Sequence, residues 1–155
     1  MSFESAFSYL KERGYEDRII TFDVSTATVA LAAEALHTEE CRIAKTLGFL
    51  CSDGPILVVM AGDARADNRK YKNTFHEKAH MLSFDDAVER IGHAPGGVCP
   101  FGVREGVRIY LDVSLKKYDT VFPAVGSSNS AVELTPAELE GLLPDASWVD
   151  IAKDQ

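Results

Sequence analysis

The sequence predicts an α+β fold, in which a mixed, mostly antiparallel sheet of about seven short strands curls, barrel-like, among surrounding helices. Short apolar or alternating segments predict the strands, and four or five segments of helical periodicity lie between them. These segments do not alternate regularly between strand and helix, as a doubly wound parallel sheet would require. No repeat or long linker divides the 155 residues, so one domain over residues 1–155 is expected.

Composition limits the classes of function. The chain is 46% hydrophobic, with no apolar run of membrane-spanning length and no N-terminal signal segment, so a soluble cytoplasmic protein without membrane contact is expected. Its three cysteines lack paired spacing, which fits a reducing compartment better than a disulfide framework. A net charge of −8 argues against a broad nucleic-acid-coating surface and leaves room for a local basic patch.

The first elements follow from apolar spacing and helix-end signals. Apolar residues three or four apart predict an N-terminal helix that ends at Gly14, and residues 19–24 predict a short strand. The alanine-rich segment 28–36 predicts a second helix, with Ser25 or Thr26 as its cap.

A hairpin is expected next, from strands at 41–51 and 56–61 joined by Ser52-Asp53-Gly54. Strand alternation places Lys45 on an otherwise apolar face of the first strand. A buried ammonium without a partner is costly, so Lys45 should meet a partner, a cavity or a substrate. An edge-strand lysine that discourages aggregation, or that extends its amine to solvent, explains the same position.

Basic residues gather between Gly62 and Lys78, where residues 67–75 have helical spacing. Phosphate contacts come mainly from Lys and Arg, so this segment is the best candidate for a phosphate-facing surface; a solvated helix face is the alternative. The candidate residues are Arg65, Arg69, Lys70 and Lys72.

The pentapeptide from His76 to His80 matches H-E-x-x-H, a zinc-hydrolase motif that requires one helix to present both histidines on one face. The preceding helix is expected to end near His76, and residues 79–82 predict a short strand. The match is therefore interpreted as coincidence, with a zinc hydrolase kept as the least favoured alternative.

Ser83 begins a further predicted helix, with Phe84, Val88 and Ile91 facing inward. A loop rich in glycine, Gly96–Gly102, follows it; such a loop can direct several N–H groups toward a carbonyl or an anion, or can be a tight connection. Its Cys99 has no evident partner to lower its pKa, although His93 is close in sequence, so a structural cysteine is favoured over a nucleophile.

The C-terminal third continues the mixed pattern. Residues 107–113 alternate as a half-buried strand, and residues 118–125, interrupted by Pro123, predict an irregular or edge strand. A polar loop over 126–130 could bind a ligand or form only a turn. The remaining expected elements are a strand at 131–134, a helix from Thr135 to about Leu143, and a strand at 148–151.

Several of these segments, taken together and in order, resemble the YbaK/ProX family of free-standing aminoacyl-tRNA deacylases, which are similar to the editing domain inserted in bacterial prolyl-tRNA synthetases. The likeness extends from about Asp23 to Ile151. The segments are Ala44-Lys45-Thr46-Leu47, Gly62-Asp63, Asp67-Asn68-Arg69-Lys70, Gly92-His93, Gly96-Gly97-Val98-Cys99-Pro100-Phe101-Gly102, Tyr110-Leu111-Asp112, Val121-Phe122-Pro123-Ala124 and Gly126-Ser127-Ser128-Asn129-Ser130.

The resemblance implies hydrolysis of an amino acid wrongly esterified to tRNA, typically tRNA for proline, with no metal or organic cofactor. It makes Lys45 the residue on which activity depends. The substrate-binding candidates that it implies are Gly96, Gly97, Val98, Cys99, Pro100 and Gly102 in the first loop, and Gly126, Ser127, Ser128 and Asn129 in the second. Some relatives have a histidine in that second loop, and this chain does not.

By the same resemblance the acceptor end of aminoacyl-tRNA is the partner, prolyl-tRNA synthetase is a further candidate partner, and the basic residues from Arg65 to Lys72 are candidates for tRNA contact. A non-catalytic adaptor that binds tRNA or a synthetase is the alternative function. The chemistry needs positioning, water and oxyanion stabilisation rather than a Ser-His-Asp set. Lys45 as an ammonium is preferred to Lys45 as a neutral base. The amino acid, the tRNA and the oligomeric state stay open.

Overall fold

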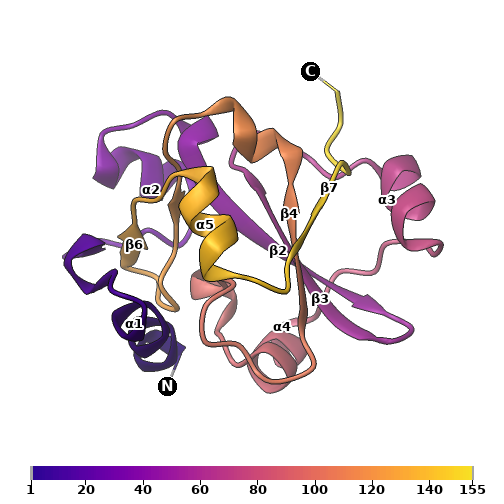
Figure 1. The fold of residues 1–155 in the computed structure, drawn as a ribbon, viewed down its shortest axis with the longest axis horizontal. Helices are drawn as coiled ribbons and strands as arrows, with labels where there is room; N and C mark the ends of the chain where they lie inside the picture. The colour runs from indigo at the N-terminus through magenta and orange to yellow at the C-terminus, as the bar shows by residue number, and fades with distance from the viewer. Residues whose placement is uncertain (1, 155) are drawn as a thin grey trace.

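A computed structural model describes residues 2–154 (Figure 1). Its centre is a five-stranded sheet of order β5-β2-β3-β4-β7. β2 (Ile43–Cys51) and β3 (Gly54–Ala61) form an antiparallel hairpin that pairs Ala44 with Ala61 and Cys51 with Gly54. The other three neighbours run parallel, and they are β5 (Phe122–Pro123) beside β2, β4 (Arg108–Asp112) beside β3, and β7 (Ser147–Val149) beside β4.

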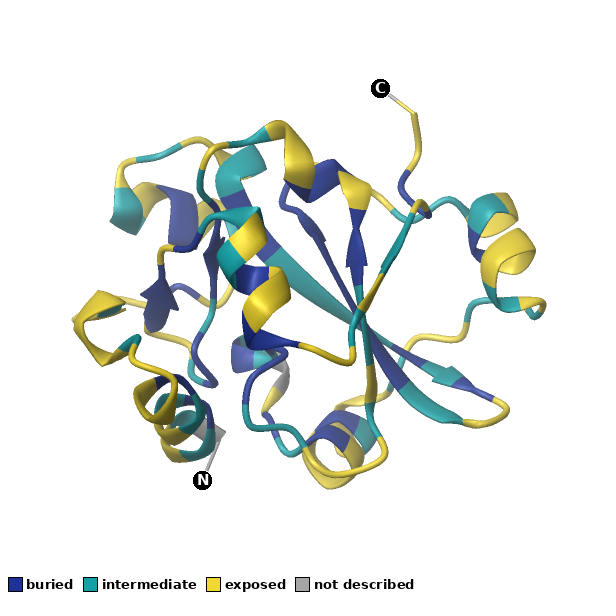
Figure 2. Cartoon of the chain, in the orientation of Figure 1, coloured by how far each residue is buried: buried dark blue, intermediate teal, exposed yellow. Residues whose placement is uncertain are grey.

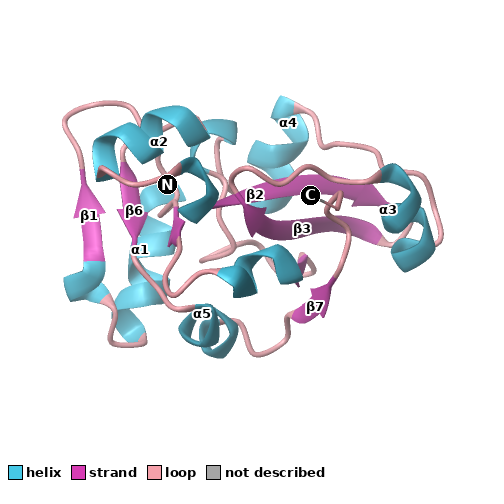
Figure 3. Cartoon of the chain, turned by 90° about the horizontal axis from the view of Figure 1, so that it is seen from above, coloured by secondary structure: helices cyan, strands magenta, loops and turns pink. Residues whose placement is uncertain are grey.

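A second, two-stranded antiparallel sheet joins β1 (Ile19–Thr21) to β6 (Ser130–Val132). A single antiparallel bridge between Val121 and Leu134 links the segment before β5 to the segment after β6, so the strands curl from one sheet toward the other. Figure 3 shows β1, β6 and α2 at one end of the molecule and α3 at the other.

The helices cover both faces of the main sheet and its ends. The α-helices are α1 (Ser2–Glu12), α2 (Val29–Leu36), α3 (Asn68–Phe75), α4 (Phe84–Asp86) and α5 (Pro136–Leu142), and a π-helical turn over Ala87–Ile91 extends α4. Short 3₁₀ turns occupy Glu16–Arg18, Glu40–Arg42, Pro95–Gly97 and Val113–Lys117. Buried residues concentrate on the strands and the inward helix faces, while exposed residues line the outer faces of the helices (Figure 2).

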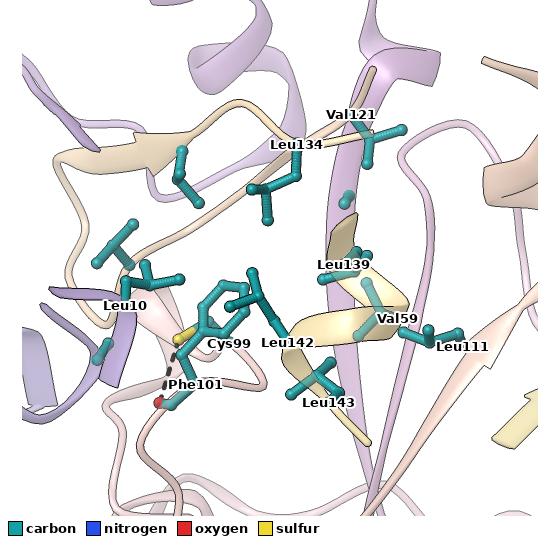
Figure 4. Close-up of a cluster of buried hydrophobic side chains, with 14 of the residues drawn as sticks. Leu10, Val59, Cys99, Phe101, Leu111, Val121, Leu134, Leu139, Leu142 and Leu143 are labelled. Carbon is teal, nitrogen blue, oxygen red and sulfur yellow. Dashed lines mark hydrogen bonds between the residues drawn. The ribbon is translucent and has the colours of Figure 1, made fainter. Parts of the chain in front are cut away.

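Strand alternation divides the core between the two faces of the sheet. On one face α1 and α5 pack against Val59 and Leu111, and Figure 4 shows Leu10, Phe101, Leu139 and neighbouring apolar side chains that fill this space. On the other face Tyr71 and Phe75 of α3 pack against Phe49, Val58 and Met60. Two successive ring contacts, with centroids 4.8 and 4.7 Å apart, join Phe49 to Tyr71 and Tyr71 to Phe75.

The expected α+β class, the mixed curled sheet and the seven strands are confirmed within the described residues. Parallel pairs take a larger share of the main sheet than expected, because β4, β5 and β7 each enter it after a long connection. The hairpin, the edge position of β5 and the helix that begins after Thr135 are as predicted; Thr135 and Glu138 form a reciprocal capping box.

Three local predictions were wrong. Thr28, rather than Ser25 or Thr26, caps α2, since its side chain accepts the Leu31 N–H at 3.1 Å. Residues 79–82 form only one antiparallel bridge, Phe49 to Met81, rather than a strand. The strand expected at 107–113 is not half-buried by simple alternation, because Asp112 is fully buried while Val113 is exposed.

The inward face predicted for residues 83–91 was right at Ile91 and wrong at Phe84 and Val88. Phe84 is 67% exposed and Val88 42% exposed, whereas Ala87 and Ile91 are buried. The Gly92 N–H donates to the Ala87 carbonyl at 3.1 Å, a bond that spans five residues rather than four. This wider turn changes which residues share a face, so a period of 3.6 residues assigns the wrong side chains to the core.

Asp112 fastens β4 to two other segments. One carboxylate oxygen accepts the N–H of Ile151 at 2.8 Å, and the other accepts the N–H of Ser114 at 2.9 Å. The Ser114 hydroxyl in turn accepts the N–H of Ala61 at the end of β3, at 3.1 Å. Since all of these groups are buried, removal of the carboxylate would leave two N–H groups without acceptors.

We therefore predict that Asp112→Ala lowers the free energy of unfolding by about 2–4 kcal/mol, the cost of two unsatisfied buried donors. Urea denaturation followed by circular dichroism measures this. Asp119→Ala is the matched control, because Asp119 is exposed and its loss should change stability by less than about 0.5 kcal/mol. Equal stability of the two variants would contradict the structural role of Asp112.

Candidate active site

A small cavity of about 110 Å³ lies beside the N-terminal half of β2. Its walls come from residues 26–29 at the start of α2, residues 43–46 of β2, Gly96 and Val98 of the glycine-rich loop, and residues near β5 and β6. Pockets that hold drug-sized ligands are about 300–1,000 Å³ in volume. The cavity therefore suits a small group, such as one amino acid side chain with its carbonyl, rather than a nucleotide.

The cavity occupies a gap in the strand pairing along one edge of β2. β5 pairs with β2 only as far as Ala44. The next hydrogen bonds along this edge run from the Leu82 N–H to the Gly48 carbonyl and from the Leu50 N–H to the His80 carbonyl. Backbone groups of alternate strand residues point to the same edge, so the N–H and C=O of Thr46 also point there, between these two partners. The gap offers a backbone donor and acceptor at the cavity wall.

Lys45 lies on this wall with its side chain half-buried. The ammonium donates to the carbonyls of Gly62, at 3.2 Å, and of Ala64. Burial lowers the pKa of Lys45 below its ordinary value; the Asp63 carboxylate opposes this shift and the Arg65 guanidinium adds to it. An ammonium has three N–H donors, and the described residues supply acceptors for two of them, so one remains for a ligand.

The glycine-rich loop reaches the cavity through Gly96 and Val98. The Gly97 N–H is already donated to the Ala94 carbonyl at 2.8 Å, which leaves it unable to bind a ligand. A Cβ at Gly97 would lie 2.5 Å from the Ser127 nitrogen, so the two small-residue loops make backbone-to-backbone contact that only glycine permits. The structure thus brings the two predicted loops together at Gly97 and Ser127.

The second loop serves chiefly to hold the segment before α2. The Phe22 N–H donates to the Asn129 carbonyl at 2.9 Å, and the Thr26 N–H to the Ser128 carbonyl at 2.6 Å. The Ser127 hydroxyl is hydrogen-bonded to Asn129 Oδ1 and to the Ser130 hydroxyl, at 2.9 and 2.6 Å. Ser130, rather than the predicted residues from Gly126 to Asn129, lines the cavity.

Three predicted residues of the first loop face away from the cavity. Cys99 is fully buried, and burial raises its pKa to about 12, so the thiolate that a nucleophile requires is disfavoured. Pro100 is buried beside it, and a Cβ at Gly102 would lie 2.4 Å from the Ser5 carbonyl oxygen of α1. These three residues are packed within the loop and against its neighbours, and they do not line the cavity.

His93 is equally unsuited to activate Cys99. Its Nε2 donates to the Phe101 carbonyl at 2.7 Å, and burial lowers the pKa of the imidazole. A carbonyl can only accept, so Nε2 must carry the proton of this hydrogen bond. Protonated Nε2 cannot act as a base toward the Cys99 thiol, whose sulfur lies 3.6 Å from it.

The basic segment divides into exposed and paired residues. Arg65, Arg69 and Lys72 are exposed. Lys70 instead binds the carboxylates of Asp150 at 3.1 Å and Asp154 at 2.8 Å, which makes it the least suitable of the four for phosphate contact. Three of the four named candidates thus remain exposed and available for phosphate contact.

As expected, the H-E-x-x-H segment lies outside a helix. α3 ends at Phe75, and His76 adopts the left-handed conformation with φ of 62°. Glu77 accepts hydrogen bonds from the Ser52 N–H and hydroxyl, at 3.0 and 2.8 Å. The two histidines therefore lack the shared helix face on which the zinc motif depends.

The contribution of residues 26–29 to the cavity was not predicted from the sequence. Thr26 is buried, and its hydroxyl and that of Thr46 have no hydrogen-bond partner in the described part of the chain. Both residues line the cavity, where a bound polar group could satisfy hydroxyls that are otherwise costly to bury. The run of small and polar residues from Ser25 to Thr28 was the available signal, but it was interpreted only as a helix cap.

The fold and site define a class of domain, a curled α+β sheet with a small cavity at a gap in its edge, a half-buried lysine and two glycine-containing loops. Residues 23–142 match the aminoacyl-tRNA editing domain, and the chain belongs to that family. The resemblance found from the sequence motifs is thereby confirmed.

Comparison with individual known proteins supports the same family assignment. The chain is 47% identical to the uncharacterized protein YwhH of Bacillus subtilis over 99% of both chains. It is 27% identical to the proline--tRNA ligase of that organism over 68% of this chain and 18% of the ligase. A solved structure described as a candidate trans-editing enzyme for prolyl tRNA synthetase superposes with a TM-score of 0.89 at 28% identity, covering 99% of this chain and 98% of that one.

Among the described residues, no helix is both long and apolar enough to cross a membrane.

The contact between the two loops yields a second prediction. Gly97→Ala should destabilise the protein by about 1–3 kcal/mol, because its methyl group would force apart backbone atoms of Gly97 and Ser127. Gly96→Ala should fold with nearly unchanged stability, since its Cβ would lie 3.4 Å from Ala27 Cβ and 3.5 Å from Ser128 Cβ. Thermal unfolding of the pair distinguishes them, and a stable Gly97→Ala variant would refute the close loop contact.

Proposed function

We propose that this protein hydrolyses the ester bond of mischarged aminoacyl-tRNA. The observation that carries the proposal is the small cavity with Lys45 on its wall, which lies within the residues that match the editing-domain family. Water attacks the ester carbonyl, the bond to the ribose oxygen breaks, and free amino acid and uncharged tRNA result. The similarity to proline--tRNA ligases supports tRNA for proline, or a related tRNA, as the carrier.

An aminoacyl ester is already activated, so the protein has to position it, admit water and stabilise the developing oxyanion. We assign the last task to backbone N–H groups at the cavity wall, that of Gly96 in the loop and that of Thr46 at the edge of β2. Gly97, a member of the originally predicted set, is left out because its N–H is already bonded.

Lys45 acts in this proposal as an ammonium that binds the substrate through its third N–H. Two carbonyl acceptors favour the charged form of the amine, whereas burial favours the neutral form. The carbonyls also fix the position of the nitrogen, which a binding role requires. A neutral general base would direct its nitrogen lone pair at water, but the hydrogen bonds to the two carbonyls are weaker for an uncharged amine than for an ammonium.

The cavity volume favours a small amino acid as the group that is removed. The unpaired hydroxyls of Thr26 and Thr46 offer partners for its polar atoms. A pocket discriminates between side chains by only about 1–3 kcal/mol per methylene, so further selectivity would come from the tRNA or from prolyl-tRNA synthetase as a partner. Arg65, Arg69 and Lys72 are the proposed phosphate contacts, and a cytoplasmic location follows from the proposed substrate.

We predict that the purified protein releases amino acid from at least one member of a panel of mischarged tRNAs, and that Lys45→Ala lowers the rate constant at least about 100-fold. Loss of a positioned charged donor gives an effect of this size. Single-turnover release of radiolabelled amino acid measures it. Circular dichroism and thermal unfolding test whether the variant remains folded.

Lys11→Ala is the matched control, because Lys11 is an exposed lysine on α1 and its variant should keep the wild-type rate. Full turnover by Lys45→Ala would show that the assigned mechanism is wrong. Tight binding of the panel without hydrolysis by the wild-type protein would instead favour the adaptor function.

The protonation state of Lys45 gives a separate prediction. If the ammonium binds the substrate, the enzymatic rate constant falls as pH rises through the lowered pKa of Lys45, and the fall therefore begins below its ordinary value of 10.5. A general base would give the opposite slope, with the rate rising through the same pKa. A pH–rate profile, corrected at each pH for uncatalysed ester hydrolysis, decides between the two roles.

A further inference from the structure

A second hollow, of about 270 Å³, lies further along the same edge of β2. Met81, Leu82, Phe84, Ala87 and Ile91 form its outer side, and no charged residue lines it. We call it the apolar trough. Figure 3 shows α4, which begins with Phe84, alongside β2.

The trough and the small cavity adjoin each other. Thr46 and Val98 line both of them, so one residue of β2 and one of the glycine-rich loop form the boundary. The cavity extends from this boundary toward Ile43, and the trough extends toward Gly48. A ligand with two joined parts could therefore fill both hollows, with its junction at the Thr46 backbone.

Two large apolar side chains of the trough are exposed to solvent. Phe84 is 67% exposed and Met81 is 61% exposed. The backbone beneath them is fixed, because the Leu82 N–H donates to the Gly48 carbonyl at 3.0 Å and the Leu82 side chain occupies the space that a Cβ at Gly48 would need. Aromatic and thioether groups presented on a fixed support form a surface on which a flat ring can stack.

Resting on the proposed function, we propose that the apolar trough binds the terminal nucleoside of tRNA, with its base stacked on Phe84 and Met81. The ester joins the amino acid directly to this nucleoside. An amino acid in the 110 Å³ cavity therefore places the ribose at the boundary and the base just beyond it. A neutral base suits the uncharged trough, and base stacking on aromatic side chains is the usual means of holding an unpaired nucleotide.

The first test compares Phe84→Ala with Val88→Ala. Val88 is also exposed and belongs to the same helical segment, but it does not line the trough. Loss of one stacking contact is worth about 5- to 150-fold in affinity, so Phe84→Ala should raise KM for mischarged tRNA by about that factor with kcat little changed. Phe84→Trp should restore KM, and Val88→Ala should resemble the wild type. An unchanged KM in Phe84→Ala would overturn the inference while the proposed function stood.

The second test does not require turnover. Calorimetry measures binding of 3′-aminoacylamino-3′-deoxyadenosine, in which a stable amide replaces the ester and no phosphate is present. Wild-type protein and Val88→Ala should bind it, and Phe84→Ala should lose about 5- to 150-fold in affinity. If the wild type hydrolyses no mischarged tRNA but shows this pattern, the proposed function fails and the nucleoside site stands. Equal or absent binding across the three proteins would overturn the site.

A second copy of the chain is the competing occupant of an exposed apolar surface. Sedimentation of the wild type and Phe84→Ala over a range of concentrations tests it. Monomers in both cases agree with the nucleoside site. A wild-type dimer that Phe84→Ala dissociates would assign the trough to self-association and overturn the inference.

Discussion

The turn after β3 is the constraint on which the candidate site depends. Its Gly62 and Ala64 carbonyls receive the Lys45 ammonium, so the turn determines where that charge lies. Gly62 packs so closely on Glu40 that a Cβ would lie 2.1 Å from the Glu40 carbonyl oxygen, and only glycine can occupy the position. On the far side, the Ser114 hydroxyl that Asp112 positions holds the N–H of Ala61. Lys45 is thus oriented by backbone groups that are themselves fixed by buried contacts, which costs less than pairing the ammonium with a buried carboxylate.

The site itself arises because β2 has an incomplete neighbour. β5 is only two residues long, so strand pairing stops beside Ala44. Pairing resumes only at Gly48, where Leu82 supplies an N–H. An unpaired strand edge is normally a liability for aggregation. Here the two small-residue loops and the start of α2 enclose this edge, so that Thr46 forms part of the cavity wall.

Local rules predicted the parts of the molecule that local forces determine. The hairpin at Ser52-Asp53-Gly54, the capping box at Thr135 and the place of Lys45 on an apolar strand face all depend on neighbours a few residues away. The same rules failed where distant contacts or unusual geometry decide. No periodicity reveals the π-helical turn that exposes Phe84, or the hydrogen bond from Thr26 to Ser128 that brings the start of α2 to the cavity. The resemblance to tRNA-editing proteins could be drawn only from the order of the motifs along the sequence. The contact between the two loops, at Gly97 and Ser127, exists only in the folded structure.

The charge of the protein constrains how it could hold a polyanion. With a net charge of −8, long-range electrostatics repel tRNA, and the exposed cations proposed for phosphate contact are few, Arg65, Arg69 and Lys72. In the proposed function, affinity must therefore come largely from the amino acid and the terminal base, which the protein can enclose. The uncharged trough and the small cavity provide that enclosure on either side of Thr46. Such an arrangement would bind an aminoacyl end without retaining the tRNA after the ester is cleaved, because hydrolysis separates the two groups that the hollows hold together. In the proposed reaction, weak phosphate attraction would then favour release of the deacylated tRNA.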